Sequence, residues 1–414
     1  MRLFKIMSAL VLIASLLLAI QATLGKRKTD YDDELNKIQS DITNAKNDAN
    51  SPPNEAAAKL SYLLYLQASL TGSVEHIRLA KAKIERTLQT FSSSEELYLA
   101  EANINLKLHQ LHDANEVLNK LPDLSDNTKA LALKADIAMQ EGNYAEAKSS
   151  YEANLLRRRS WDNIARLAYL KSIFGDIANA EALYVQAEDE ISAKEMRSYA
   201  WVELQRGFLD FNHGRYEAAM AHYRQAEKAY SGYWLVHEYL AECLGAERRY
   251  QEAVSLFENV LERSPRPEVQ QALGDLYIFM GKPEMAKAWH DRALATYLDS
   301  AQRGEVLYFH HLASFYADVR ENGEEAIKWA GKDLGIRQNF AAHDAMAWAL
   351  YRAGRFDESL AEAKVALATG ASDARLLFHA AMIHLAVGLA DEGRQLLSRA
   401  GQVNPRYDAF HVHR

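Results

Sequence analysis

The sequence predicts an all-α protein, a right-handed α-solenoid of about ten antiparallel helix pairs. Two observations predict this fold: a helix–turn–helix unit recurs along most of the chain, and apolar positions within each unit are spaced three and four residues apart. The clearest copy is residues 347–367, AWALYRAGRFDESLAEAKVAL. Gly354 provides its turn, because glycine adopts a positive φ at little cost, and two helices joined by so short a turn lie antiparallel.

The turn recurs at a nearly constant spacing. Turns are centred on residues 142, 175, 214, 248, 281, 354 and 388, so the steps are 33, 39, 34 and 33 residues, then 73 for two units, and 34 for the last. A small residue recurs five positions after the turns, counting a weaker copy at residue 109: Ala114, Ala147, Ala180, Ala219, Ala253, Ala286, Ser359 and Gly393. Another recurs seven positions before them: Ala102, Ala135, Ala168, Ala241, Gly274, Ala347 and Ala381. Small side chains at these positions allow the two backbones to approach where the helices cross.

This pattern resembles the tetratricopeptide repeat family, whose period is about 34 residues in two helices. The resemblance covers roughly residues 55–405, and it is carried by Gly142, Tyr144, Ala147 and Tyr151, by Gly214, Tyr216, Ala219 and Tyr223, and by Tyr250, Ala253, Phe257 and Pro265. Some copies depart from the family pattern. Arg248 replaces a turn glycine, Pro283 replaces an aromatic residue, and the copies near Trp201 and Phe309 are one residue out of register. Longer helices or loops are expected at these last two.

Residues 1–25 are interpreted as a signal peptide or an N-terminal membrane anchor. Arg2 and Lys5 precede an uncharged run, residues 6–24, which is just long enough to span a bilayer as a helix. We therefore expect an exported protein, periplasmic or extracellular, that is released or tethered to the membrane by this segment. The basic residues 26–28 leave an alternative, an anchored adaptor that faces the cytoplasm.

The chain between this segment and the repeats, residues 26–54, is polar and is expected to be a helical spacer. Its apolar residues are spaced four and three apart on one helix face: Tyr31, Leu35, Ile38, Ile42 and Ala45. This stripe indicates a helix that rests on the first repeat or, alternatively, a weak dimerisation segment. At the other end, residues 406–414 form a short tail in which Tyr407 and Phe410 are the residues suited to capping the last repeat.

Composition argues against several functions. The chain has 48 basic and 56 acidic residues and a net charge of −8, whereas nucleic-acid binding requires clustered lysine and arginine. The single cysteine, Cys243, cannot form an intrachain disulfide and is expected to be a buried thiol. No catalytic or nucleotide-binding motif is found, and the histidines lack the helical spacing of metal ligands. The sequence therefore predicts a protein that is not an enzyme, with no cofactor and no metal.

The remaining candidate is the inner face of the solenoid, which the family resemblance implies is a groove for peptides. Counted at 100° per residue, this face carries Asp162, Ala165, Tyr169 and Ser172, then Leu235, Glu238 and Glu242, then Glu268, Gln271, Asp275 and Ile278. In the last two copies the candidate partner-binding groove comprises Asp344, Trp348, Tyr351, Arg375, Phe378 and Met382. The middle of the face is thus expected to be acidic and the C-terminal end aromatic.

The aromatic stripe Trp201, Leu204, Phe208 and Phe211 is assigned to packing, because the opposite face of that helix is charged. Two interpretations of the C-terminal aromatic residues stay open: contact between neighbouring first helices, or a rigid shelf for a segment of a partner. We expect a non-catalytic protein–protein interaction scaffold of the cell envelope that binds a protein or peptide. The alternative is an enzyme or cofactor-handling site built on the solenoid.

Overall fold

The computed structural model describes residues 28–48, 50–91, 94–122 and 124–410, and these form 21 α-helices, α2 to α22, and one π-helical turn, η1. The described part contains no strand, and the predicted all-α solenoid is confirmed. The first five pairs are α3 (Pro53–Thr71) with α4 (Val74–Thr90), α5 (Glu95–Lys107) with α6 (Leu111–Leu118), α7 (Thr128–Gln140) with α8 (Tyr144–Arg157), α9 (Trp161–Ile173) with α10 (Ile177–Asp189), and α11 (Met196–Asn212) with α12 (Tyr216–Ala229).

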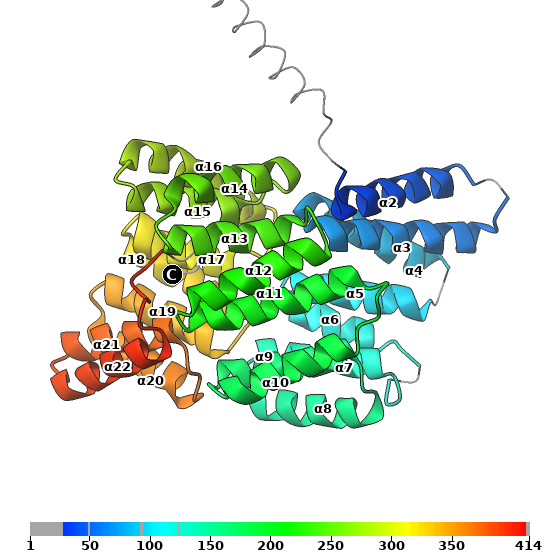
Figure 1. Ribbon diagram of the computed structural model, residues 1–414. Helices are drawn as coiled ribbons and strands as arrows, with labels where there is room; N and C mark the ends of the chain where they lie inside the picture. Colours follow the sequence, from blue (N-terminus) through cyan, green and yellow to red (C-terminus); the bar gives the residue numbers. More distant parts are fainter. Residues whose placement is uncertain (1–27, 49, 92–93, 123, 411–414) are drawn as a thin grey trace, which may run out of the picture.

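Five further pairs follow, which makes ten in the described residues (Figure 1). They are α13 (Trp234–Ala246) with α14 (Tyr250–Arg263), α15 (Pro267–Phe279) with α16 (Pro283–Gln302), α17 (Phe309–Ser314) and η1 (Phe315–Val319) with α18 (Gly323–Leu334), α19 (Phe340–Arg352) with α20 (Phe356–Ala368), and α21 (Ala374–Ala386) with α22 (Ala390–Val403). The small-residue column after the turns is buried in every pair where it was identified: Ala114, Ala147, Ala180, Ala219, Ala253, Ala286, Ser359 and Gly393.

The turns keep one backbone conformation even where glycine is absent. Gly142 has a φ of 86° and Gly354 one of 77°, and Arg248, which replaces a turn glycine, still adopts a φ of 62°. The left-handed conformation is therefore imposed by the packing of the two helices, and at Arg248 it is held at a cost in backbone energy.

The two copies with long spacing differ as the sequence indicates. The first helix of one copy, α11, has 17 residues where α9 and α13 have 13. Before the other copy, α16 extends to 20 residues, and α17 then continues into η1, where the Arg320 amide donates to the Phe315 carbonyl five residues back. A π-helical turn accommodates one extra residue without ending the helix, which explains the shift of register seen in the sequence.

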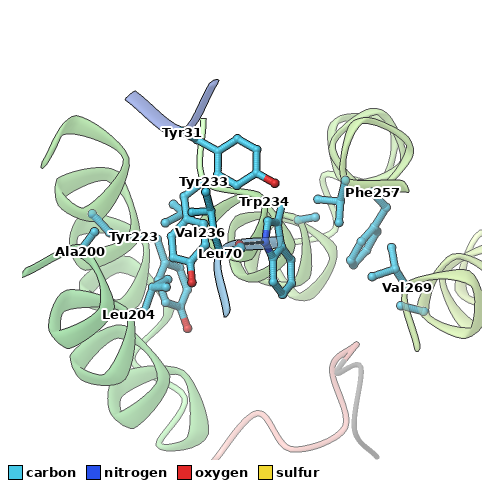
Figure 2. Packing of buried hydrophobic residues seen from close by; sticks show 14 of the residues in the cluster. Tyr31, Leu70, Ala200, Leu204, Tyr223, Tyr233, Trp234, Val236, Phe257 and Val269 are labelled. Atoms are coloured by element: carbon cyan, nitrogen blue, oxygen red, sulfur yellow. Dashed lines mark hydrogen bonds between the residues drawn. The ribbon is translucent and has the colours of Figure 1, made fainter. Parts of the chain in front are cut away.

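An N-terminal helix, α2 (Asp30–Lys46), precedes the pairs and packs against α3. Thr29 closes a capping box with Asp32 at its start. The apolar stripe of this helix is used within the chain, because Tyr31, Ile38, Ile42 and Ala45 are all buried. In Figure 2, Tyr31 lies beside Tyr233 and Trp234, at the start of the sixth pair. The Trp234 indole Nε1 donates to the Leu70 carbonyl at 2.9 Å.

That last contact belongs to a larger feature: successive turns of the superhelix touch each other. The Asn339 side chain donates to the Gln140 carbonyl at 2.9 Å across 199 residues, and the Phe340 amide donates to the Tyr144 hydroxyl at 3.0 Å. The Ser372 amide donates to the Ile173 carbonyl at 2.8 Å. We call this line of contacts the seam. It means that repeats contact units far along the chain as well as their neighbours, as the closeness of α9–α11 and α20–α22 in Figure 1 indicates.

The C-terminal tail continues the seam. The Arg406 carbonyl accepts a hydrogen bond from Tyr216 at 3.0 Å, and the Arg406 guanidinium lies over the Tyr216 ring. Tyr407 contacts Phe378 of the last pair, with ring centroids 5.4 Å apart. Phe410 is 1% exposed and packs beneath Gly245 of α13. The tail thus covers helices of the middle of the chain in addition to the last repeat.

The predicted signal peptide or anchor, residues 1–25, lies outside the described residues. Within the described ranges, no helix is both long and apolar enough to cross a bilayer. Cys243 is buried, as expected, and burial, followed by nearby Glu247, raises the pKa of its thiol to about 12.

Candidate functional site on the inner face

Helices α19 and α21 bring the predicted groove residues together. Trp348 lies between two rings: its centroid is 4.8 Å from that of Tyr351 and 4.1 Å from that of His379, and both pairs are stacked. Phe378 lies at its side, at 6.5 Å, and Met382 follows one turn later on α21 and is half-buried. The spacing of three and four residues on each helix produces this arrangement, because it places the side chains on one face.

Beneath the rings lies a buried ionic cluster. Asp344 is 3% exposed, and its carboxylate is 3.0 Å from Nδ1 of His379 and 3.7 Å from the Arg375 guanidinium. Burial disfavours the charged carboxylate, but His379 and then Arg375 outweigh it, so the pKa of Asp344 lies below its ordinary value. Asp344 therefore contacts Arg375 and His379 from a buried position between α19 and α21, and not from the surface.

The packing interpretation accounts for the contacts between α19 and α21. Trp348 also donates from Nε1 to a carboxylate oxygen of Asp318, in η1, at 2.8 Å, which ties a third first helix into the cluster. Trp348, Tyr351 and Phe378 are each half-buried, so part of each ring stays accessible. Their use as a shelf for a partner stays a prediction.

The expected acidic middle of the inner face is not an acidic surface. Glu238 and Glu268 are buried, and both pair with Arg266, at 3.2 Å and 3.0 Å. Arg266 also lies over the Trp234 ring, 5.0 Å from its centroid. Arg266 stands in the loop before α15, outside the helical periodicity used to read the face, so its contribution was not visible in the sequence pattern.

Part of the predicted inner face of α9 borders a cavity of about 150 Å³ that also receives residues from α10, α11, α19, α21 and α22. Tyr169 and Ser172 line this cavity. Tyr169 keeps 43% of its surface accessible, yet burial and then Asp373 raise the pKa of its phenol. The accessible surface and the raised pKa agree if the Tyr169 ring faces an internal space that water can enter. We call this space the seam cavity.

Sequence reasoning missed the α11 side of the seam cavity. Phe208 and Gln205 line it, although Phe208 had been assigned to packing because the opposite face of α11 is charged. That charged face is in fact buried: Arg206 pairs with Glu181 at 2.5 Å and with Glu188 at 3.0 Å. The ion pairs come from α10, so no pattern within α11 could show that its charges point inward. Leu204 and Phe211 are buried, as assigned. Phe208 also packs, against Tyr239 of α13 with ring centroids 5.7 Å apart, while it lines the cavity.

No group of three or more His, Cys, Asp or Glu side chains in the described ranges is arranged to hold a metal ion. The rings of His310 and His311 are 3.9 Å apart, and His310 also contacts His109 across the seam.

Stacked antiparallel helix pairs define the chain as an α-solenoid, a class built by repetition of a two-helix unit. A family model described as tetratricopeptide repeat matches residues 128–155, which span α7 and α8, and residues 267–297, which span α15 and most of α16. These two segments of the chain thus match tetratricopeptide repeats.

Solved structures provide distant likenesses. The chain is similar to a chain of the APC/C hetero-tetramer Cut9-Hcn1, with a TM-score of 0.46 and 13% identity over 90% of this chain and 79% of that one. It is similar to the human IFIT1 dimer with PPP-AAAA, with a TM-score of 0.46 and 15% identity over 89% and 94%. A tetratricopeptide repeat protein from Parabacteroides merdae gives a TM-score of 0.36 and 16% identity over 59% and 94%. Comparison with curated proteins found no match.

Proposed function

We propose that this protein is a non-catalytic interaction scaffold of the cell envelope, which binds a segment of a partner protein at the C-terminal end of its inner face. Tetratricopeptide repeats in general support protein–protein interaction, and the repeats matched here support that broad role. The envelope location rests on the apolar run in residues 6–24 of the sequence.

The observation that carries the site is the half-buried aromatic column formed by Tyr351, Trp348 and Phe378, whose rings keep part of their surface accessible. Rigid aromatic side chains lose little conformational entropy when a partner covers them, so they contribute strongly to binding. The buried Asp344 carboxylate is hydrogen-bonded to the His379 imidazole and so holds it in place. The His379 ring stacks on Trp348 and thereby supports the column from beneath. Such a preorganised surface suits an extended or helical segment with apolar side chains.

The binding site is tested by affinity purification from the envelope fraction of the native host, followed by measurement of the Kd for each partner found. Tyr351→Ala should weaken binding by roughly 5- to 150-fold, the effect of about 1–3 kcal/mol at an interface hot spot. Trp348 is left in place, because it is held between two rings and its removal would disturb packing. Leu156→Ala is the control, since Leu156 on α8 is 91% exposed and lies outside the aromatic column. Equal Kd values for wild type and Tyr351→Ala, with equal helicity, would refute the site.

The location is tested separately by protease digestion of intact and permeabilised cells. An exported scaffold should lose its repeats to a protease that enters the periplasm or acts from outside while cytoplasmic proteins stay intact. Protection of the repeats until the cytoplasm is opened would favour the adaptor that faces the cytoplasm.

A further inference from the structure

The seam cavity lies between two turns of the superhelix and is closed on two sides by seam contacts. Its first wall is made by α9, α10 and α11, and its second by the starts of α19 and α21 and the end of α22. One closing contact is the hydrogen bond from the Ser372 amide to the Ile173 carbonyl at 2.8 Å. At the other side Asn404 and Pro405 pack on Gly214, where an added Cβ would lie 2.7 Å from the Asn404 Oδ1. The cavity is therefore a product of the superhelical closure and not of any single repeat.

Three polar side chains that line the cavity make no hydrogen bond to the described protein. Tyr184 is 1% exposed, lines the cavity, and makes no hydrogen bond with another described residue. The equivalent tyrosine one repeat earlier, Tyr151, donates to Asp136 at 2.8 Å. The Tyr184 hydroxyl can therefore form a hydrogen bond with a molecule in the cavity. The side chains of Tyr169 and Gln205 also reach the cavity without a hydrogen bond to the described protein.

The charges of the lining residues limit which ligands the cavity would accept. Asp373 is the one carboxylate among the lining residues, and they include neither lysine nor arginine. One of its oxygens, Oδ1, accepts from the Leu376 amide at 2.8 Å and so caps α21. His213 also lines the cavity, and burial, more than any other cause, lowers the pKa of its imidazole. An anionic ligand would thus meet a carboxylate and no cation, whereas a neutral or singly positive ligand would be accommodated.

The aromatic side chains in the cavity walls indicate the shape of the ligand. Phe208 and Phe340 present rings to the cavity together with the two tyrosines. A volume of about 150 Å³ is close to that of an engineered protein cavity that holds benzene. Ring faces with hydrogen-bonding groups between them are the usual lining of a small-molecule site.

We propose that the seam cavity is a binding site for a small ring compound that carries one hydrogen-bonding group and is neutral or singly positive. This site goes beyond the proposed scaffold role and uses none of the residues of the aromatic column. A ligand held between the two walls would strengthen the contact between turns of the superhelix, because it would touch both.

The test uses three probes that share one ring and differ in charge: benzyl alcohol, benzylamine and benzoate. Each is titrated into the full-length protein at neutral pH, with binding followed on the probe by NMR saturation transfer. Benzyl alcohol and benzylamine should bind with a Kd on the order of 1 mM, as expected for ligands of this size. Benzoate should bind at least tenfold more weakly. Failure of both non-anionic probes, or benzoate binding as tightly as benzylamine, would overturn the proposal.

Matched variants assign the binding to this cavity. Ala374→Leu adds a side chain inside the cavity and should weaken both binding probes by at least tenfold. Ala386→Leu makes the same change at the exposed far end of the same helix and should leave both Kd values unaltered. Equal affinity in the two variants would place the probes elsewhere and refute the site.

Two further substitutions report on individual groups without disturbing the fold. Asp373→Asn keeps a side chain that can cap α21, and should reduce the preference for benzylamine over benzoate. Tyr184→Phe removes only a hydroxyl group and should weaken benzyl alcohol by about 2- to 10-fold, the usual effect of one hydrogen bond. Unchanged probe affinities in both variants would overturn the proposed contacts even if Ala374→Leu did not fold.

Discussion

The contact between turns of the superhelix can be tested by two glycine substitutions that are equivalent in sequence. Gly142 and Gly354 are both turn glycines, with φ values of 86° and 77°. Around Gly354 no atom lies within 4 Å of the position that a Cβ would take, whereas at Gly142 that position is 2.3 Å from the Gln338 carbonyl oxygen. Gly142→Ala and Gly354→Ala therefore share the backbone strain and differ in the seam contact.

The magnitudes follow from these two effects. A left-handed conformation costs a residue with a side chain about 1–2 kcal/mol, so Gly354→Ala should lower the free energy of unfolding by about that amount. Gly142→Ala should add the cost of forcing a methyl group into a packed site, about 1–3 kcal/mol. The carbonyl of Gln338 belongs to backbone, so the strain is relieved by opening the seam rather than by rotating a side chain.

Hydrogen exchange measured by mass spectrometry separates the two variants. In the wild type the Phe340 amide donates to Tyr144 across the seam, and peptides containing Phe340 should be protected. Gly142→Ala should speed their exchange by roughly 5- to 150-fold, corresponding to about 1–3 kcal/mol. Gly354→Ala should leave these peptides unchanged and affect only its own turn. Identical exchange near Phe340 in both variants would refute the seam.

Three other substitutions test single features. Arg248→Gly should raise the free energy of unfolding by about 0.5–1 kcal/mol, since relief of left-handed strain exceeds the entropy lost with glycine; a lower urea midpoint would contradict this. Phe410→Ala should cost about 3–5 kcal/mol, because its buried ring anchors the tail, and an unchanged melting temperature would argue against that anchoring. Burial, and then Arg337, lower the pKa of His109 to about 4, below its unfolded value of about 6.5. The folded state thus binds fewer protons than the unfolded state. The resulting contribution of His109 to the free energy of unfolding is complete above a pH of about 6.5 and is lost as the pH falls towards about 4. His109→Gln should remove about 2–3 kcal/mol of that pH dependence in urea denaturation, and parallel curves for variant and wild type would contradict the assignment.

The repeat itself could be predicted because each unit repeats the same local physics. Turn glycines and small crossing residues act within one helix pair, so a period near 34 residues is enough to predict the pairs. The sequence also showed where copies are irregular: the pattern near Phe309 is shifted by one residue, and the structure has a π-helical turn there, at residues 315–319. The groove residues on α19 and α21 were brought together for the same reason, since helical spacing determines which side chains share a face.

Charge pairing between elements could not be predicted in this way. Glu238 and Glu268 were read as an open acidic face, but Arg266 from a loop neutralises both. On α11 the charged residues point into an ion-pair network, and the apolar Phe208 faces the seam cavity. Within one helix an acid next to an apolar stripe looks solvent-facing; only the neighbouring helix shows whether a cation meets it.

The seam could not be predicted for the same reason, because it depends on contacts between elements, here between whole turns of the superhelix. The pitch of the superhelix is the sum of small rotations between repeats, and no single repeat encodes that sum. Gly142 and Gly354 occupy the same place in their units, yet one faces open space and the other a backbone from nearly 200 residues further on. Because the seam cavity exists only where two turns meet, its residues come from helices that share no local pattern. A site of this kind is accessible to sequence reasoning only after the pitch is known, which is why the aromatic column within one pair of repeats was found and the cavity was not.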